Sequence, residues 1–115
     1  MVEPQVGNTD PILVLTTVDN LDRAQAIARG LVEAKLSACV SLVPRVLSIY
    51  RWQGKTIEDS EFLLLVKTRR DRLEELERWM LREHPYDVPE FLGFAAIKAS
   101  PAYSAWLREA TEPTG

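Results

Sequence analysis

The stretch SACVSLVPRVLSIYRWQGKTIEDSEFLLLVKT, residues 37–68, decides the fold. Side chains alternate along 46–52 and again along 62–67 with the two-residue period of a β-strand. Both faces of each run are largely apolar, so we expect both faces to be covered. Between the runs, QGKT contains a glycine that can supply the positive φ of a tight turn. The stretch therefore predicts one long β-hairpin, with a bulge or sheet edge at Pro44, which lacks a ladder donor.

The segments before the hairpin predict a strand and then a helix. PILVLTT, residues 11–17, is a β-branched, apolar run of strand length. Residues 19–36 then place apolar side chains at three- and four-residue steps, as one face of a helix does. Asp19 or Asn20 is the expected N-cap, and Gly30 is expected to allow close packing on a sheet.

The segments after the hairpin predict a helix, a strand and a last short helix. Residues 71–84 form the helical pattern, which Asp71 is expected to cap and the proline at position 85 to stop. Residues 87–99 have the composition of a strand. Ser100 and Pro101 are a strong helix-start signal for the segment that ends at residue 110. Residues 1–10 and 111–115 are expected to be frayed.

This order predicts an α+β protein with the ferredoxin-like β-α-β-β-α-β sandwich, extended by a long hairpin and a short C-terminal helix. The 115 residues suit a single domain, 1–115. Extended, residues 42–53 would span about 40 Å, whereas a domain of this size has a radius of gyration of about 13 Å. The hairpin tip should therefore project. An exposed apolar hairpin is an aggregation hazard unless another chain covers it, so we expect an oligomer.

Composition excludes several classes of protein. A formal charge of −3 gives no electrostatic footprint for nucleic acid or an anionic membrane. No apolar run approaches the roughly 20 residues that span a bilayer. The single cysteine, Cys39, excludes an internal disulfide and is expected to be a small core residue in a cytoplasmic protein. No phosphate loop or nucleophile elbow is present, and Glu58, Asp59 and Glu61 are interpreted as a solvated acidic patch, so we expect no enzyme.

EHPYDVPEF, residues 83–91, gathers the ligand-type side chains of the chain and supports two interpretations. His84 stands at a helix end, where an imidazolium interacts favourably with the helix dipole. Its imidazole, together with the carboxylate of Glu90, also suits copper or zinc. Residue chemistry alone favours the helix-end role and leaves the metal role open.

Five motifs then resemble one family in order and spacing. They are LVEAKLSACVSLVP (31–44), SIYRWQGK (48–55), LLLVKT (63–68), HPYDVPE (84–90) and PAYSAWL (101–107). Together they resemble the CutA family of divalent-cation tolerance proteins, over roughly residues 12–107. The resemblance implies a homotrimer similar in architecture to the PII signalling proteins. It also implies copper(II) or zinc as a bound ion, with His84 and Glu90 as the candidate metal ligands. Some members carry a cysteine where this chain has Thr16, so a copper(I) site is not expected.

A ligand cleft is the second candidate site. Tyr50, Trp52 and Tyr86 could line such a cleft with Lys67 as its charged anchor. The alternative, which we favour, is that the aromatic side chains are buried between subunits; a cleft at the interface would satisfy both. The leading functional hypothesis is a homotrimer that binds divalent metal in tolerance or sensing. The alternative is a trimeric scaffold or small-molecule signalling module with incidental metal binding.

Overall fold

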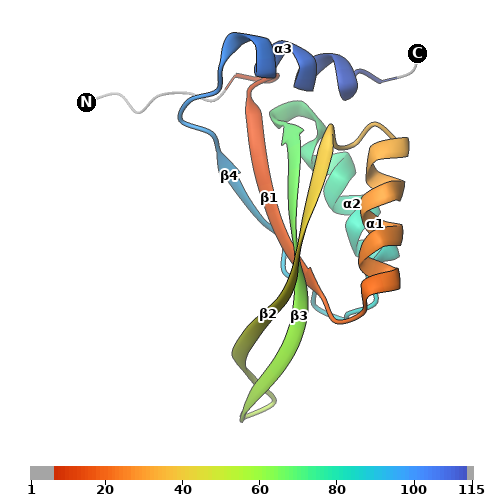
Figure 1. The fold of residues 1–115 in the computed structure, drawn as a ribbon, viewed down its shortest axis with the longest axis vertical. Helices are drawn as coiled ribbons and strands as arrows, with labels where there is room; N and C mark the ends of the chain where they lie inside the picture. The colour runs from red at the N-terminus through yellow and green to blue at the C-terminus, as the bar shows by residue number, and fades with distance from the viewer. Residues whose placement is uncertain (1–6, 114–115) are drawn as a thin grey trace.

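The computed structural model describes residues 7–113 and confirms the ferredoxin-like arrangement (Figure 1). The elements in chain order are β1 (Pro11–Val18), α1 (Leu21–Glu33), β2 (Cys39–Trp52), β3 (Lys55–Arg69), α2 (Leu73–Glu83), β4 (Leu92–Ala95) and α3 (Pro101–Ala110). The sheet order is β2-β3-β1-β4, and every neighbouring pair is antiparallel. Within the described residues, no helix is both long enough and apolar enough to cross a membrane.

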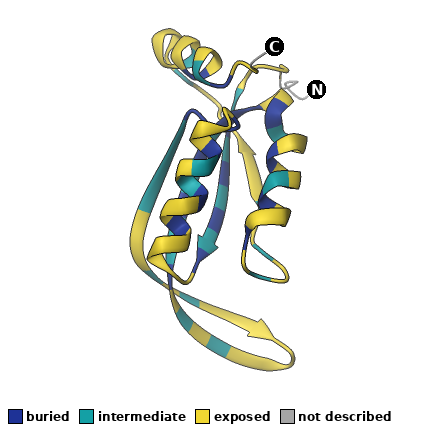
Figure 2. Cartoon of the chain, turned by 90° about the vertical axis from the view of Figure 1, so that its right-hand side faces the viewer, coloured by how far each residue is buried: buried dark blue, intermediate teal, exposed yellow. Residues whose placement is uncertain are grey.

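The hydrophobic core lies between one face of the sheet and the helices α1 and α2 (Figure 2). Burial alternates strictly along β1, because successive side chains of a strand point to opposite faces. The fully buried core side chains come from β1, β3 and both helices: Val14, Val18, Ala24, Leu31, Leu64, Val66, Leu76 and Met80. The opposite sheet face is only partly covered, since α3 lies across one end of the sheet (Figure 1).

The hairpin of β2 and β3 projects from the domain, as the sequence predicts (Figure 1). The chain measures 43 × 39 × 23 Å and its radius of gyration is 15.1 Å, above the roughly 13 Å of a compact domain of this length. At the tip, Gln53 and Gly54 both have positive φ, as a type I′ turn requires. The predicted irregularity at Pro44 is confirmed, because the strand register shifts between Val43 and Val46.

Two predicted elements have different boundaries in the structure. The strand expected over 87–99 is only Leu92–Ala95, the four residues that pair with Ile12–Leu15 of β1, and its C-terminal end lies where that partner strand begins, at Pro11. The predicted cap Asp71 is wrong. A short 3-10 turn, residues 70–72, precedes α2, and the Asp71 carboxylate pairs with the guanidinium of Arg69 at 2.8 Å. Asn20 is the N-cap of α1, accepting a hydrogen bond from the backbone N–H of Arg23, and Ser100 caps α3.

Gly30 serves helix–helix contact, which differs from the predicted contact with the sheet. A Cβ atom at this position would lie 2.8 Å from the Trp79 ring of α2. The missing side chain therefore lets the Trp79 ring lie against the α1 backbone.

The C-terminal residues are better anchored than expected. Thr111 is buried and donates a hydrogen bond to the Leu107 carbonyl at 2.8 Å, and Glu112 pairs with Arg69 at 3.1 Å. Of the segments predicted to fray, residues 1–6 and 114–115 lie outside the described part of the chain.

Candidate functional site

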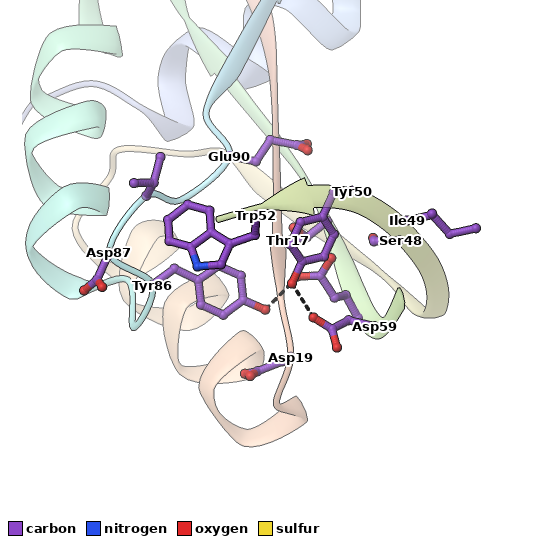
Figure 3. A pocket seen from close by; sticks show the side chains of 12 residues that line it. Thr17, Asp19, Ser48, Ile49, Tyr50, Trp52, Asp59, Tyr86, Asp87 and Glu90 are labelled. Carbon is purple, nitrogen blue, oxygen red and sulfur yellow. Dashed lines mark hydrogen bonds between the residues drawn. The ribbon is translucent and has the colours of Figure 1, made fainter. Parts of the chain in front are cut away.

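A cavity of about 570 Å³ opens between the hairpin and the segment that joins α2 to β4 (Figure 3). Its volume lies in the range of small-molecule sites. Three segments distant in sequence meet there, namely the end of β1, the hairpin and residues 86–90. The lining residues are Thr17, Asp19, Ser48, Ile49, Tyr50, Trp52, Asp59, Glu61, Tyr86, Asp87, Val88 and Glu90.

The hairpin register presents its polar lining residues on one face. Ser48 pairs directly with Asp59, and paired residues of an antiparallel ladder share a face. Tyr50 and Glu61 each stand two positions further along their strands, so they point to that same face. The alternation of the two strands thus places a tyrosine and two carboxylates together at the cavity wall.

Both lining tyrosines donate their hydroxyl protons to carboxylates. The Tyr50 hydroxyl donates to Asp59, and this bond raises the pKa of Tyr50 to about 12. The Tyr86 hydroxyl donates to Glu61 at 2.7 Å; burial, followed by this bond, raises the pKa of Tyr86 well above its usual value. Both phenols therefore stay protonated at neutral pH. Glu61 is only 5% exposed, and the Tyr86 hydroxyl satisfies one of its oxygens.

The cavity is acidic. Its carboxylates are those of Asp19, Asp59, Glu61, Asp87 and Glu90, and no lysine or arginine of residues 7–113 is among the lining residues. The acidic groups are distributed around the wall. Within that same range, no three His, Cys, Asp or Glu side chains lie close enough together to hold one metal ion. One chain therefore attracts cations to this cavity without forming a closed metal site.

His84 uses both ring nitrogens for backbone hydrogen bonds. Nδ1 accepts from the Tyr86 N–H at 3.1 Å, so the proton of the neutral ring is on Nε2, which donates to the Thr17 carbonyl at 2.9 Å. The ring is 6% exposed and stands edge-on to the Tyr86 ring. His84 thereby joins the 84–86 turn to β1. To ligate a metal it would have to release one of these bonds, and its metal role stays a prediction.

Burial lowers the pKa of His84 below its usual value of about 6.5, and the bond to Thr17 only partly opposes this. In the unfolded chain the imidazole binds its proton at higher pH than in the folded chain. We therefore expect stability to be highest above pH 6.5 and to fall as pH drops from there toward the folded-state pKa. Thermal unfolding of wild type at pH 7.5 and pH 5.5 should give the lower melting temperature at pH 5.5.

The matched variant is His84→Gln, whose amide can both donate and accept but does not titrate. Its melting temperature should fall less between the two pH values than that of wild type. An equal or larger fall in the variant would assign the pH dependence to other groups.

The structure separates the four residues of the predicted ligand cleft. Tyr50, Trp52 and Tyr86 all line the cavity, whereas Lys67 does not. Lys67 is on β3, and its amine instead donates to the hydroxyl of Ser41 on β2 and lies 3.7 Å from the thiol of Cys39 on the same strand. The prediction that Cys39 is a core residue is wrong, because Cys39 is half-buried beside this amine and does not belong to the core cluster.

Glu90 lines the cavity as a candidate ligand, but sequence reasoning misses its acidic companions on the hairpin. Asp59 and Glu61 are not the solvated patch that was expected; of the three acidic residues only Glu58 is exposed, whereas Asp59 is half-buried and Glu61 is buried. The available signal is alternation, because 59 and 61 share a face with each other and, through the register, with Tyr50. That register depends on the bulge after Val43, and the sequence does not show by how many residues the bulge shifts the pairing.

Comparison with known proteins identifies the family. Residues 12–110 match the family described as the CutA1 divalent ion tolerance protein. The chain is 46% identical over 99 residues to the divalent-cation tolerance protein CutA of Thermus thermophilus, covering 86% of this chain and 96% of that protein. It is 41% identical to the chloroplastic protein CutA of Arabidopsis thaliana and 40% identical to human protein CutA. The chain spans 55% and 54% of those two longer proteins.

Solved structures agree with the sequence match. The Thermus thermophilus Cut A1 structure superposes with a TM-score of 0.85 at 44% identity, covering 88% of this chain and 98% of that one. The CutA structure from Xylella fastidiosa superposes with a TM-score of 0.87 at 33% identity, covering 90% and 99%. Fold, motifs and identity over nearly the whole described chain agree, and the protein therefore belongs to the CutA family of divalent-cation tolerance proteins.

Proposed function

We propose that the protein is a non-enzymatic, cytoplasmic homotrimer that binds a divalent metal ion, copper(II) or zinc, in metal tolerance or sensing. The observation that carries the proposal is the acidic cavity, which five carboxylates line and which no lysine or arginine of residues 7–113 lines. Carboxylates concentrate divalent cations electrostatically. The names of relatives that refer to divalent-cation tolerance support the same role.

The ion would be bound by Glu90 together with donors that a neighbouring subunit supplies. One chain does not bring three ligand-type side chains close enough together among residues 7–113, so a tight site needs additional donors. His84 is the other candidate ligand. It would contribute only if the Tyr86 N–H released Nδ1, the nitrogen that holds the lone pair.

Trimer formation rests on the apolar surface that one chain leaves open. Leu47 and Ile49 on the hairpin are 63% and 60% exposed, and Leu92 and Phe94 on β4 are also exposed. β2 and β4 are the two sheet edges, whose unpaired backbone groups are open to another chain. A neighbouring subunit would cover both features.

We expect calorimetric titration at pH 7.5 to show tighter binding of copper(II) than of zinc, and weak binding of magnesium. First-row affinities rise toward copper, and magnesium gives up its waters reluctantly. Glu90→Gln keeps the shape of the side chain and removes its charge. Loss of a residue that only supports a metal ligand already lowers metal affinity about tenfold, so this variant should weaken copper binding by that factor or more. The matched control is Glu77→Gln on the exposed surface of α2, which should bind as wild type does.

The same titration at pH 5.5 distinguishes the ligands. A metal needs neutral imidazole, and burial lowers the pKa of His84, so ligation by His84 would persist to lower pH than for an ordinary histidine. His84→Gln should weaken binding only if His84 is a ligand. Equal copper affinity in wild type and Glu90→Gln would contradict the proposed site.

The alternative function, a trimeric scaffold or small-molecule signalling module, is favoured by one observation. A cavity of about 570 Å³ is far larger than a single ion needs and has the size of sites for organic ligands.

A further inference from the structure

Aromatic rings form part of the wall of the acidic cavity. Trp52, Tyr50 and Tyr86 line it (Figure 3), and in the single chain Trp52 and Tyr50 are 42% and 40% exposed. Both tyrosine hydroxyls are already bonded to carboxylates, so each ring is held in place by its polar end. A held ring loses little conformational freedom when a ligand packs on its face.

In one chain the cavity is too large, and its charges are too dispersed, for a bare ion to contact all of them together. Its carboxylates stand on β1, on the hairpin and in the 86–90 segment, around about 570 Å³. No three ligand-type side chains of the described range converge on one point. A cation that satisfies this wall must itself be several ångströms across and must carry apolar groups for the rings.

We propose that this cavity binds a small organic ammonium ion, held by the faces of Trp52 and Tyr50 and by the surrounding carboxylates. An ammonium ion over an aromatic face is attracted by the ring quadrupole, most strongly at tryptophan. Alkyl groups on the nitrogen spread the positive charge and pack against the rings. Glu90 and Asp87 neutralise the charge from the opposite segment. The inference does not rest on metal binding.

The charge of the wall explains the choice of ligand class. An aromatic cavity without charge would accept any apolar molecule of suitable size. Here five carboxylates and no lining lysine or arginine, among residues 7–113, oppose an anion. A neutral apolar molecule would desolvate Glu90 and Asp87 without replacing their water contacts, and that costs free energy. Positive charge and apolar bulk are therefore required together.

Choline and its neutral carbon isostere, 3,3-dimethylbutan-1-ol, are the matched probes. Their shapes are nearly the same and only choline is charged. We expect saturable choline binding by calorimetry and by saturation-transfer NMR, in buffer with EDTA so that metal ions do not contribute. The isostere should bind at least about tenfold more weakly, as the loss of cation–π and ionic attraction predicts. Full-length protein is used throughout.

Two variants and two controls locate the site. Trp52→Ala and Glu90→Gln should each weaken choline binding by about tenfold. Trp106→Ala removes a similarly exposed tryptophan outside the cavity, and Glu77→Gln removes an exposed carboxylate of α2; both should bind as wild type does. Circular dichroism and light scattering establish that each variant keeps its fold and mass. If Trp52→Ala loses either, Glu90→Gln alone decides the result.

Three outcomes would overturn the inference. They are the absence of saturable choline binding, equal binding of the isostere, and unchanged affinity in Glu90→Gln. None of them bears on the metal proposal, whose titrations contain no organic cation. Conversely, a protein that binds choline but no copper would retain this inference and lose the metal function.

Discussion

Leu76→Ala is expected to lower the free energy of unfolding by about 2–5 kcal/mol, the range for removing a fully buried leucine. Leu76 is 0% exposed and belongs to the core that α2 forms with β1, β3 and α1. Truncation removes apolar contacts and leaves a cavity, because helices and sheet can collapse only partly. Chemical denaturation followed by circular dichroism measures the loss, at one fixed subunit concentration because assembly would contribute to stability.

Leu81→Ala is the matched control for this measurement. It makes the same substitution in the same helix, but Leu81 is 57% exposed. Its effect should lie within about 0.5 kcal/mol of zero. Equal losses in the two variants would mean that α2 does not bury the face assigned to it.

A double variant, Leu47→Asp with Ile49→Asp, is expected to break the proposed homotrimer into single chains. If the hairpin is covered by another subunit, each carboxylate would be buried without a partner, at an effective cost of several kcal/mol per ion. The cost is repeated in every subunit of the assembly. Light scattering during gel filtration should give wild type about three times the 13.0 kDa of one chain, and the variant a mass near 13.0 kDa.

Leu81→Asp tests whether a new surface charge alone causes dissociation, since Leu81 is similarly exposed but belongs to α2 and not to the hairpin. It should keep the wild-type mass. The proposed assembly fails if wild type elutes at the mass of one chain, or if the hairpin variant keeps the full mass.

Much of the fold could be predicted from local sequence pattern. An apolar run of strand length predicts β1, and the 3.6-residue apolar period predicts α1 and α2, because each helix buries a single stripe. The chemistry of Ser100 and Pro101 predicts the start of α3. Where periodicity gives no clear boundary, strand pairing decides where a strand begins and ends. β4 is only Leu92–Ala95, the four residues that pair with Ile12–Leu15 of β1, and no pattern within 87–99 marks where that pairing begins or ends.

The sequence predicts which residues contribute to the candidate site but not how they are grouped in space. The aromatic and charged character of SIYRWQGK and HPYDVPE singles out Tyr50, Trp52, Tyr86 and Glu90, and all four line the cavity. Lys67 carries the same kind of signal but lies elsewhere, beside Ser41. Position along the chain does not specify which face or which end of a strand a side chain will share with others.

The sequence by itself determined the order of elements, the length of the hairpin and the acidic charge of the chain, because periodicity, turn chemistry and composition are local properties. Only the tertiary structure decided that Glu61 is buried against Tyr86, that Asp59 joins Tyr50, and that both nitrogens of His84 are engaged by the backbone. Each of these contacts depends on strand register, on a bulge and on the path of the 84–91 segment. The register and the path of the segment are set by how separate segments pack together, so the residues adjacent to a side chain in sequence do not specify them.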